Sequence, residues 1–289
     1  MFHPYDLTTT TSKYSELFAD GKRIETLWIA PSQAQDATPQ KPTLVMLHGG
    51  LGCVALWKDF PEQLAQTTGC IVLAYSRYGN GKSQPLGEKR PVSYMHHEGE
   101  VVLPELLEKL GIQKPVLIGH SDGGSIAIVY AGKFPDRVRA LILEAPHVFV
   151  EDISVCGAVN AKAQYETSDF RHKLAKYHQD VDATFWGWND IWLDPHFKTW
   201  NLESYLPQIR CPVLMIQGEQ DKYGTVSQLE AIRAHMPRSE VLVLSNCGHT
   251  PHRDHRETVL ARMTAFVAEV GKGPHPRSID RQIRPKSGG

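Results

Sequence analysis

The residues with the clearest chemical potential lie in a short turn at 119–123, which reads Gly-His-Ser-Asp-Gly. An apolar run at 116–118 precedes the turn, and a helical pattern follows it. Gly119 and Gly123 stand two residues either side of Ser121, as a strained strand-to-helix turn with closely approaching backbone requires. The pattern predicts a nucleophile elbow with Ser121 at its tip, in preference to a glycine-rich turn with an incidental serine.

A serine hydroxyl needs a base within hydrogen-bond reach and a third group that orients the base. Asp221 lies just after the apolar run 212–216, and His249 lies just after the run 241–244. Because parallel strands end at one edge of a sheet, both side chains are expected near Ser121. The order serine, acid, histidine is the one that accompanies this type of elbow. We therefore predict a catalytic triad of Ser121, Asp221 and His249.

Two other carboxylates compete with Asp221 for the role of the acid. Glu219 is its near neighbour, and Glu144 ends an earlier apolar run. Asp221 is preferred because Gly218 and the strand end leave room for a loop that reaches back to the histidine.

The segment around the predicted base also invites a metal-site interpretation. His249, His252 and His255 follow one another at intervals of three residues. Pro251 interrupts the segment, and neither a cysteine nor a set of carboxylates completes a closed site. The metal interpretation is therefore disfavoured, and no metal or organic cofactor is expected.

A reaction at a carbonyl also needs donors for the developing oxyanion. The glycine-rich segment 48–52, His-Gly-Gly-Leu-Gly, follows the apolar run 43–47. Its backbone can approach a substrate oxygen, and each fixed N–H typically contributes about 3 kcal/mol. We expect an oxyanion hole formed by the N–H of Asp122 and one N–H of this segment. Gly50 and Leu51 are both candidates, and Leu51 is preferred.

The elements that must position these residues alternate along the chain. Two β-rich runs, 14–18 and 23–29, are separated by an Asp-Gly step that indicates a hairpin. Short apolar runs then alternate with helical patterns, as is typical of βαβ units whose strands are covered on both faces. The apolar runs lie at 43–47, 70–75, 115–118, 140–143, 212–216 and 241–244. The expected fold is α/β, with a mostly parallel, doubly wound sheet and an N-terminal hairpin.

The segment 147–210 interrupts this alternation and is too long for a bare connection. It carries four of the six tryptophans, Trp186, Trp188, Trp192 and Trp200. We predict an inserted helical lid in which Trp186 and Trp188 contact the substrate, together with Gly50 and Asp122 of the core. The core domain is then 1–146 and 211–271, and the basic, proline-containing segment 272–289 is expected to be a disordered tail.

The composition does not indicate nucleic acid or a membrane as a partner. The chain has 31 basic and 32 acidic residues and a formal net charge of -1. No apolar stretch approaches the length of a membrane span, and the N-terminus lacks a secretory pattern. Five widely spaced cysteines without a Cys-x-x-Cys pair favour reduced thiols and a cytoplasmic location. The oligomeric state stays open.

From about Tyr14 to Gly271 these motifs, in this order, resemble the α/β-hydrolase superfamily. The turn at 79–83, Gly-Asn-Gly-Lys-Ser, is part of the resemblance. The chain departs from it at Ser76, where many members carry an aspartate. The elbow is also similar to that of valacyclovir-hydrolase-like enzymes, in which the acid after the serine holds a substrate ammonium. Asp122 then has two open interpretations, as an ammonium anchor or as a cap of the helix it begins.

The resemblance and the motifs together imply a serine hydrolase that cleaves carboxylic esters of small to medium acyl or aryl compounds through an acyl-enzyme. The same triad is compatible with an amide or aminoacyl hydrolase, similar to proline iminopeptidases, and with hydrolysis of a carbon–carbon bond. A ligand receptor on the same fold is the non-enzymatic alternative, because a fold alone does not determine function.

Overall fold

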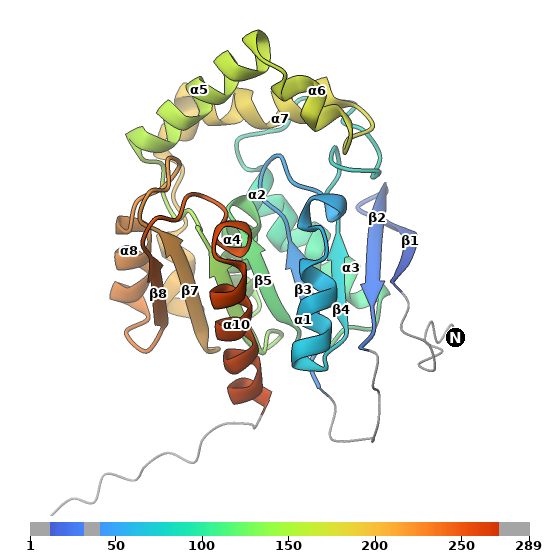
Figure 1. Cartoon of the computed structure of the whole chain (residues 1–289), viewed down its shortest axis with the longest axis vertical. Helices are drawn as coiled ribbons and strands as arrows, with labels where there is room; N and C mark the ends of the chain where they lie inside the picture. The colour runs from blue at the N-terminus through green and yellow to red at the C-terminus, as the bar shows by residue number, and fades with distance from the viewer. Residues whose placement is uncertain (1–11, 32–40, 272–289) are drawn as a thin grey trace, which may run out of the picture.

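The computed structural model describes residues 12–31 and 41–271. Its centre is an eight-stranded sheet in the order β1-β2-β4-β3-β5-β6-β7-β8 (Figure 1). Strands β3 to β8 are parallel to one another, while β2 pairs antiparallel with β1 and β4. The strands are β1 Lys13–Ala19, β2 Lys22–Ile29, β3 Leu44–Leu47, β4 Val72–Tyr75, β5 Val116–His120, β6 Ala140–Glu144, β7 Val213–Gly218 and β8 Glu240–Leu244. The predicted mostly parallel sheet is confirmed.

The predicted N-terminal hairpin is formed by β1 and β2. Ala19 pairs with Lys22, so the connection has two residues. Asp20 and Gly21 both have positive φ, 49° and 67°, which is the conformation of the tight turn that suits twisted antiparallel strands.

Helices cover both faces of the sheet and divide the core into two layers. On one face, α1 Phe60–Thr68 and α10 Arg256–Gly271 pack on side chains such as Leu44 and Met46. On the other face, α3 Leu103–Lys109, α4 Asp122–Lys133 and α8 Ser227–His235 pack on alternate residues such as Val45 and Leu47. The short helices α2 Tyr94–His97 and α9 Pro251–Asp254 complete the core, and a π-helical turn, Glu98–Val102, joins α2 to α3.

Strand β8 differs from the prediction that every apolar run is covered on both faces. It is an edge strand that pairs only with β7 among the described residues. Val241 and Val243 are 37% and 40% exposed, so one face of this strand is only partly covered by the part of the chain that the structure describes.

Between β6 and β7 the chain forms a helical insertion. Its elements are α5 Asp152–Thr167, α6 Phe170–Ala175, α7 Val181–Leu193 and two 3₁₀ segments, Pro195–Thr199 and Glu203–Gln208. Helices α5, α6 and α7 lie across the end of the sheet where the parallel strands terminate (Figure 1). This arrangement encloses space above the loops that carry the predicted site.

No helix within 12–31 and 41–271 is both long and apolar enough to cross a bilayer. The predicted disordered tail at 272–289 and the first residues, 1–11, lie outside the described residues.

Candidate active site

Ser121 occupies the sharp turn between β5 and α4. Its φ of 54° is positive, which is rare for a residue with a side chain and typical of a strained functional turn. A Cβ on Gly119 would collide with the backbone of Gly123, and one on Gly123 would collide with the carbonyl of Leu47. Both glycines are therefore needed for the elbow to close against β3.

The structure brings together the three side chains of the predicted triad. His249 Nδ1 lies 2.7 Å from Asp221 Oδ2, and His249 Nε2 lies 3.0 Å from Ser121 Oγ. Because an ionised carboxylate only accepts hydrogen bonds, Nδ1 carries the proton and donates to Asp221. Nε2 is then free to accept the hydrogen bond of the Ser121 hydroxyl, which is the arrangement of a base beside its nucleophile.

Asp221 is buried and accepts three hydrogen bonds in all. Gln217 Nε2 and the N–H of Tyr223 each donate to it over 2.8 Å, in addition to His249. Burial raises the pKa of this carboxyl, but His249 and the N–H of Tyr223 act together in the opposite direction, and the pKa lies below its ordinary value. Asp221 is therefore ionised at neutral pH and suited to hold the imidazole.

The competing groups have other partners. Glu144 is fully buried and lies 2.6 Å from His252 Nδ1, whereas Glu219 is exposed. His255 Nε2 lies 3.3 Å from the carbonyl of Asn246. The three histidines of 249–255 thus point to three different partners rather than to a common centre.

The predicted oxyanion segment lies beside the elbow. Gly50 and Leu51 both border the cavity above Ser121, and neither N–H has a hydrogen-bond partner among the described residues. Asp122 is the first residue of α4, so its N–H has no partner within the helix. Free N–H groups at these positions are what the predicted oxyanion hole requires.

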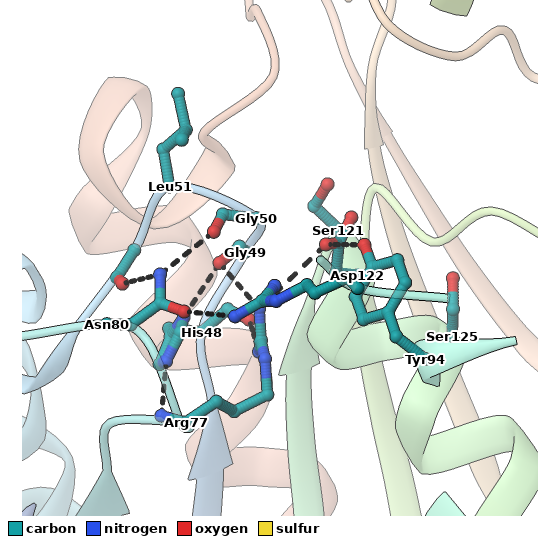
Figure 2. Close-up of polar contacts among 12 residues, drawn as sticks. His48, Gly49, Gly50, Leu51, Arg77, Asn80, Tyr94, Ser121, Asp122 and Ser125 are labelled. Carbon is teal, nitrogen blue, oxygen red and sulfur yellow. Dashed lines mark hydrogen bonds and ion pairs between the residues drawn. The ribbon is translucent and has the colours of Figure 1, made fainter. Parts of the chain in front are cut away.

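The side chain of Asp122 does not reach the cavity. The carboxylate is fully buried, Tyr94 Oη donates to its Oδ2, and Arg77 Nη2 lies 3.9 Å from the same oxygen (Figure 2). Its other oxygen, Oδ1, is buried without a hydrogen-bond partner among the described residues, so the side chain does not cap α4. The prediction of an ammonium anchor is therefore corrected, because α4 turns the carboxylate away from the cavity and toward two buried donors.

Trp186 is a second correction among the predicted substrate contacts. Trp188 lines the cavity, whereas Trp186 packs edge-on against Phe185 and Tyr165. Residues two positions apart on an α-helix are separated by about 200° of rotation about the helix axis. Their side chains therefore point to nearly opposite sides, and one helix cannot present both rings to the same cavity.

The cavity has a volume of about 430 Å³ and is mainly apolar. Its apolar and aromatic lining was mostly missed by sequence reasoning, because these residues come from several separate segments. They are Leu51, Leu56, Trp57, Phe170, Leu174, Trp188, Trp192 and Tyr223. Among the described residues that line it, the charged ones are basic, Lys58, Arg253 and Arg256, and none is a carboxylate.

Two further histidines at the site were also missed. The ring of His147 lies 5.9 Å from that of His249, and burial lowers its pKa to about 4, so it is neutral at pH 7. His120 Nε2 donates to the carbonyl of His249 over 2.6 Å and ties the base to the elbow. Both positions are recognisable in the sequence as near the site, since His147 follows the end of β6 and His120 directly precedes the nucleophile.

Comparisons with known proteins agree with this architecture. A family model described as the alpha/beta hydrolase fold matches residues 42–159 and 154–255. The human serine hydrolase BPHL is 25% identical over 216 residues, 72% of this chain and 73% of that protein. A proline iminopeptidase of Thermoplasma volcanium is 26% identical over 271 residues, 80% of this chain and 90% of that protein. In fold, the chain resembles the crystal structure of a Mycobacterium smegmatis proline iminopeptidase, with a TM-score of 0.69 at 18% identity over 90% of this chain and 99% of that one.

Proposed function

The chain belongs to the alpha/beta hydrolase fold family, and on that premise we propose that it is a serine hydrolase that cleaves carboxylic esters. The observation that carries the proposal is the hydrogen-bonded row from Ser121 through His249 to Asp221, which opens into an apolar cavity. The substrates are small-molecule esters with small to medium acyl or aryl groups, because a cavity of about 430 Å³ accommodates a compound of that size.

The proposed reaction has two halves that share one base. His249 Nε2 takes the proton of Ser121 as Oγ attacks the ester carbonyl, and the N–H groups of Leu51 and Asp122 stabilise the resulting oxyanion. The carbon–oxygen bond of the leaving alcohol breaks, and the alcohol takes the proton from His249. A water molecule then attacks the acyl-enzyme with the same histidine as base, which releases the acid and restores Ser121. No step requires a metal or an organic cofactor.

The lining of the cavity favours neutral esters over substrates that carry an ammonium group. A buried or half-buried ammonium needs a carboxylate or several acceptors to replace its hydration. The described lining contributes no carboxylate, and the Asp122 carboxylate is held by Tyr94 and Arg77. Cleavage of an aminoacyl compound is the second candidate, favoured by the likeness to a proline iminopeptidase.

The test is a fluorophosphonate label read by mass spectrometry, combined with p-nitrophenyl esters of graded chain length. We expect one label on Ser121, its loss in Ser121→Ala, and hydrolysis of acetyl to hexanoyl esters. Alanyl and prolyl p-nitroanilides provide the second arm, since faster cleavage of these than of neutral esters would replace the ester proposal by the aminoacyl one. A protein that neither takes the label nor cleaves any of these compounds would contradict the proposal and favour a receptor on this fold.

A further inference from the structure

Every carbonyl of the oxyanion segment, His48 to Gly52, accepts a hydrogen bond from a side chain. Arg77 donates to the carbonyls of His48 and Gly49, and Asn80 Nδ2 donates to those of Gly50 and Gly52 over 3.0 Å each (Figure 2). The carbonyl of Leu51 accepts from His178 Nε2 over 3.2 Å. A glycine-rich segment has little rigidity of its own. Apart from one internal hydrogen bond, from the Gly52 N–H to the Gly49 carbonyl over 3.0 Å, its shape is held by these side chains.

Fixing a carbonyl also fixes the N–H of the next residue. The peptide group is planar, and in a trans peptide C=O and N–H point in opposite directions; none of the described peptide bonds is cis. By holding the Gly49 carbonyl, Arg77 sets the direction of the Gly50 N–H. By holding the Gly50 carbonyl, Asn80 sets the direction of the Leu51 N–H. Figure 2 shows Asn80 on the side of the segment away from Ser121.

Arg77 also reaches the other half of the oxyanion hole. Its Nη2 lies 3.9 Å from Asp122 Oδ2, and both side chains are fully buried. The Ser121 carbonyl accepts from the N–H groups of Gly124 and Ser125, so the N–H of Asp122 in the same peptide points the opposite way. The guanidinium thus lies between the segment that carries Gly50 and the helix end that carries Asp122.

The protonation state of His48 is consistent with a fixed framework. The N–H of Arg77 donates to His48 Nε2 over 3.0 Å, which leaves the ring proton on Nδ1, where it donates to the Gly49 carbonyl over 2.7 Å. Burial, and then the charge of Arg77, holds the pKa of this histidine well below its ordinary value. His48 is therefore neutral, in a single tautomer, throughout the neutral pH range.

We propose that Arg77 and Asn80 are positioning residues that hold the oxyanion hole in its working geometry before substrate arrives. This inference rests on the proposed function, since it assigns a role in that reaction to two side chains that touch neither substrate nor nucleophile. Without Asn80, the Gly50 carbonyl has no hydrogen-bond donor among the described residues, so the Gly50–Leu51 peptide can rotate and present that carbonyl where the oxyanion forms. Without Arg77, the Gly49 carbonyl keeps the donors His48 Nδ1 and Gly52 N–H but loses its link to Asp122. Asp122 then acts through its carboxylate as the anchor of Arg77 on the elbow side.

The test compares Asn80→Ala and Asn80→Asp with a matched control, Asn189→Ala. Asn189 is equally buried and donates to the Ala158 carbonyl, within the insertion. With p-nitrophenyl butyrate, both Asn80 variants are expected to lose about 10²-fold in kcat with little change in KM, the usual effect of one oxyanion donor. The control is expected to match Asn80→Ala in thermal stability and the wild type in kcat.

Asn80→Asp separates positioning from packing. Aspartate has the same shape as asparagine but offers acceptors to two carbonyls, so it preserves the packing and abolishes both hydrogen bonds. Arg77→Lys, which keeps the charge and loses the planar fork, is expected to lose about 10²-fold in kcat as well. A trifluoromethyl ketone, which forms an oxyanion on Ser121, is expected to lose affinity for each variant by the same factor as kcat/KM.

The proposal is overturned if folded Asn80→Ala and Asn80→Asp retain wild-type kcat, or if Asn80→Asp behaves like the wild type while Asn80→Ala does not. A crystal structure of Asn80→Ala gives a readout that is independent of activity. The Gly50–Leu51 peptide is expected in a rotated or a mixed orientation, and an unchanged single orientation contradicts the positioning role. If the wild type fails to take the fluorophosphonate label, the proposed function fails, while the peptide orientation still decides whether Asn80 holds the segment.

Discussion

Two regions meet at the cavity, and they are held by different forces. At the end of the sheet, the elbow and the loops that carry the triad are tied by buried hydrogen bonds, such as those from Arg77 to two carbonyls. In the helical insertion, aromatic rings pack on one another: Tyr165 stacks on Phe185 at 3.7 Å, and Trp192 meets Phe197 edge-on at 5.1 Å. The first region carries the predicted reacting groups, and the second contributes aromatic and aliphatic side chains to the wall of the cavity.

Hydrogen bonds and apolar packing differ in how much structural change they tolerate. Hydrogen bonds require narrow distances and angles, so the strand-end region has one geometry and tolerates little change. Aromatic and aliphatic packing is less directional, and substitutions of similar volume are commonly accepted. We therefore expect the strand-end region to control the rate of the chemical step and the insertion to control which substrates reach it.

The largest effect is expected at the nucleophile and the base. Ser121→Ala and His249→Ala are each expected to reduce kcat by about 10⁶-fold, and the double variant by no more than either alone, because the two groups act as a unit. Thermal unfolding is expected to stay near that of the wild type, since Ser121→Ala removes a single oxygen. Additive losses in the double variant would show that the two side chains act independently and would contradict the triad.

The next effect is a loss of stability in mild acid, caused by buried neutral histidines of the strand-end region. Burial lowers the pKa of His147 to about 4, from an ordinary value near 6.5. Above pH 6.5 neither the folded nor the unfolded chain is protonated there, so stability is unaffected. Between pH 6.5 and 4 the unfolded chain takes up the proton and the folded chain does not, so the free energy of unfolding falls, by about 3 kcal/mol for this group.

Urea unfolding at several pH values between 7 and 4 measures this loss. In His147→Gln, which cannot titrate, the decline is expected to be shallower than in the wild type by the contribution of one group. Equal slopes in the two proteins would mean that His147 is protonated while the chain is still folded.

The strand-end region could be predicted from the sequence because its signals are local. Ser121, Asp221 and His249 each follow an apolar run, and a parallel sheet brings the ends of such runs to one edge. The glycines around the serine have a direct steric reason, since a Cβ on Gly123 would collide with the Leu47 carbonyl. The sequence pattern matches the observed geometry here because the end of each strand is determined by a few neighbouring residues.

The direction of Asp122 could not be predicted in the same way. Its carboxylate is held by Tyr94 and Arg77, which come from other segments. The residues around the elbow do not indicate that either side chain will pack there. The pairing of Glu144 with His252 is likewise a contact between distant segments. Trp186 is a different case, since the helical repeat of 100° per residue already separates it from Trp188.

A moderate effect is expected from Trp188, at the boundary of the two regions. Its ring lines the cavity and packs so closely on Gly50 that a Cβ there would collide with it. Trp188→Ala is expected to reduce kcat/KM for aryl and hexanoyl esters by about 10- to 100-fold through lost contacts. For the acetyl ester, steady-state kinetics is expected to give a change within about threefold. A uniform loss for all esters would place Trp188 among the groups that control the chemical step.

The smallest effect is expected from Trp186, two residues earlier on the same helix. Its ring contacts Phe185 and Tyr165 rather than the cavity, and it is only half-buried. Trp186→Ala is therefore expected to lower thermal stability slightly and to leave the ester profile within about twofold of the wild type. Measured beside Trp188→Ala, it removes the same kind of side chain from the same helix, but one that faces away from the cavity and is less buried. Equal shifts in ester preference for both variants would mean that the insertion acts through its overall packing rather than through the ring that lines the cavity.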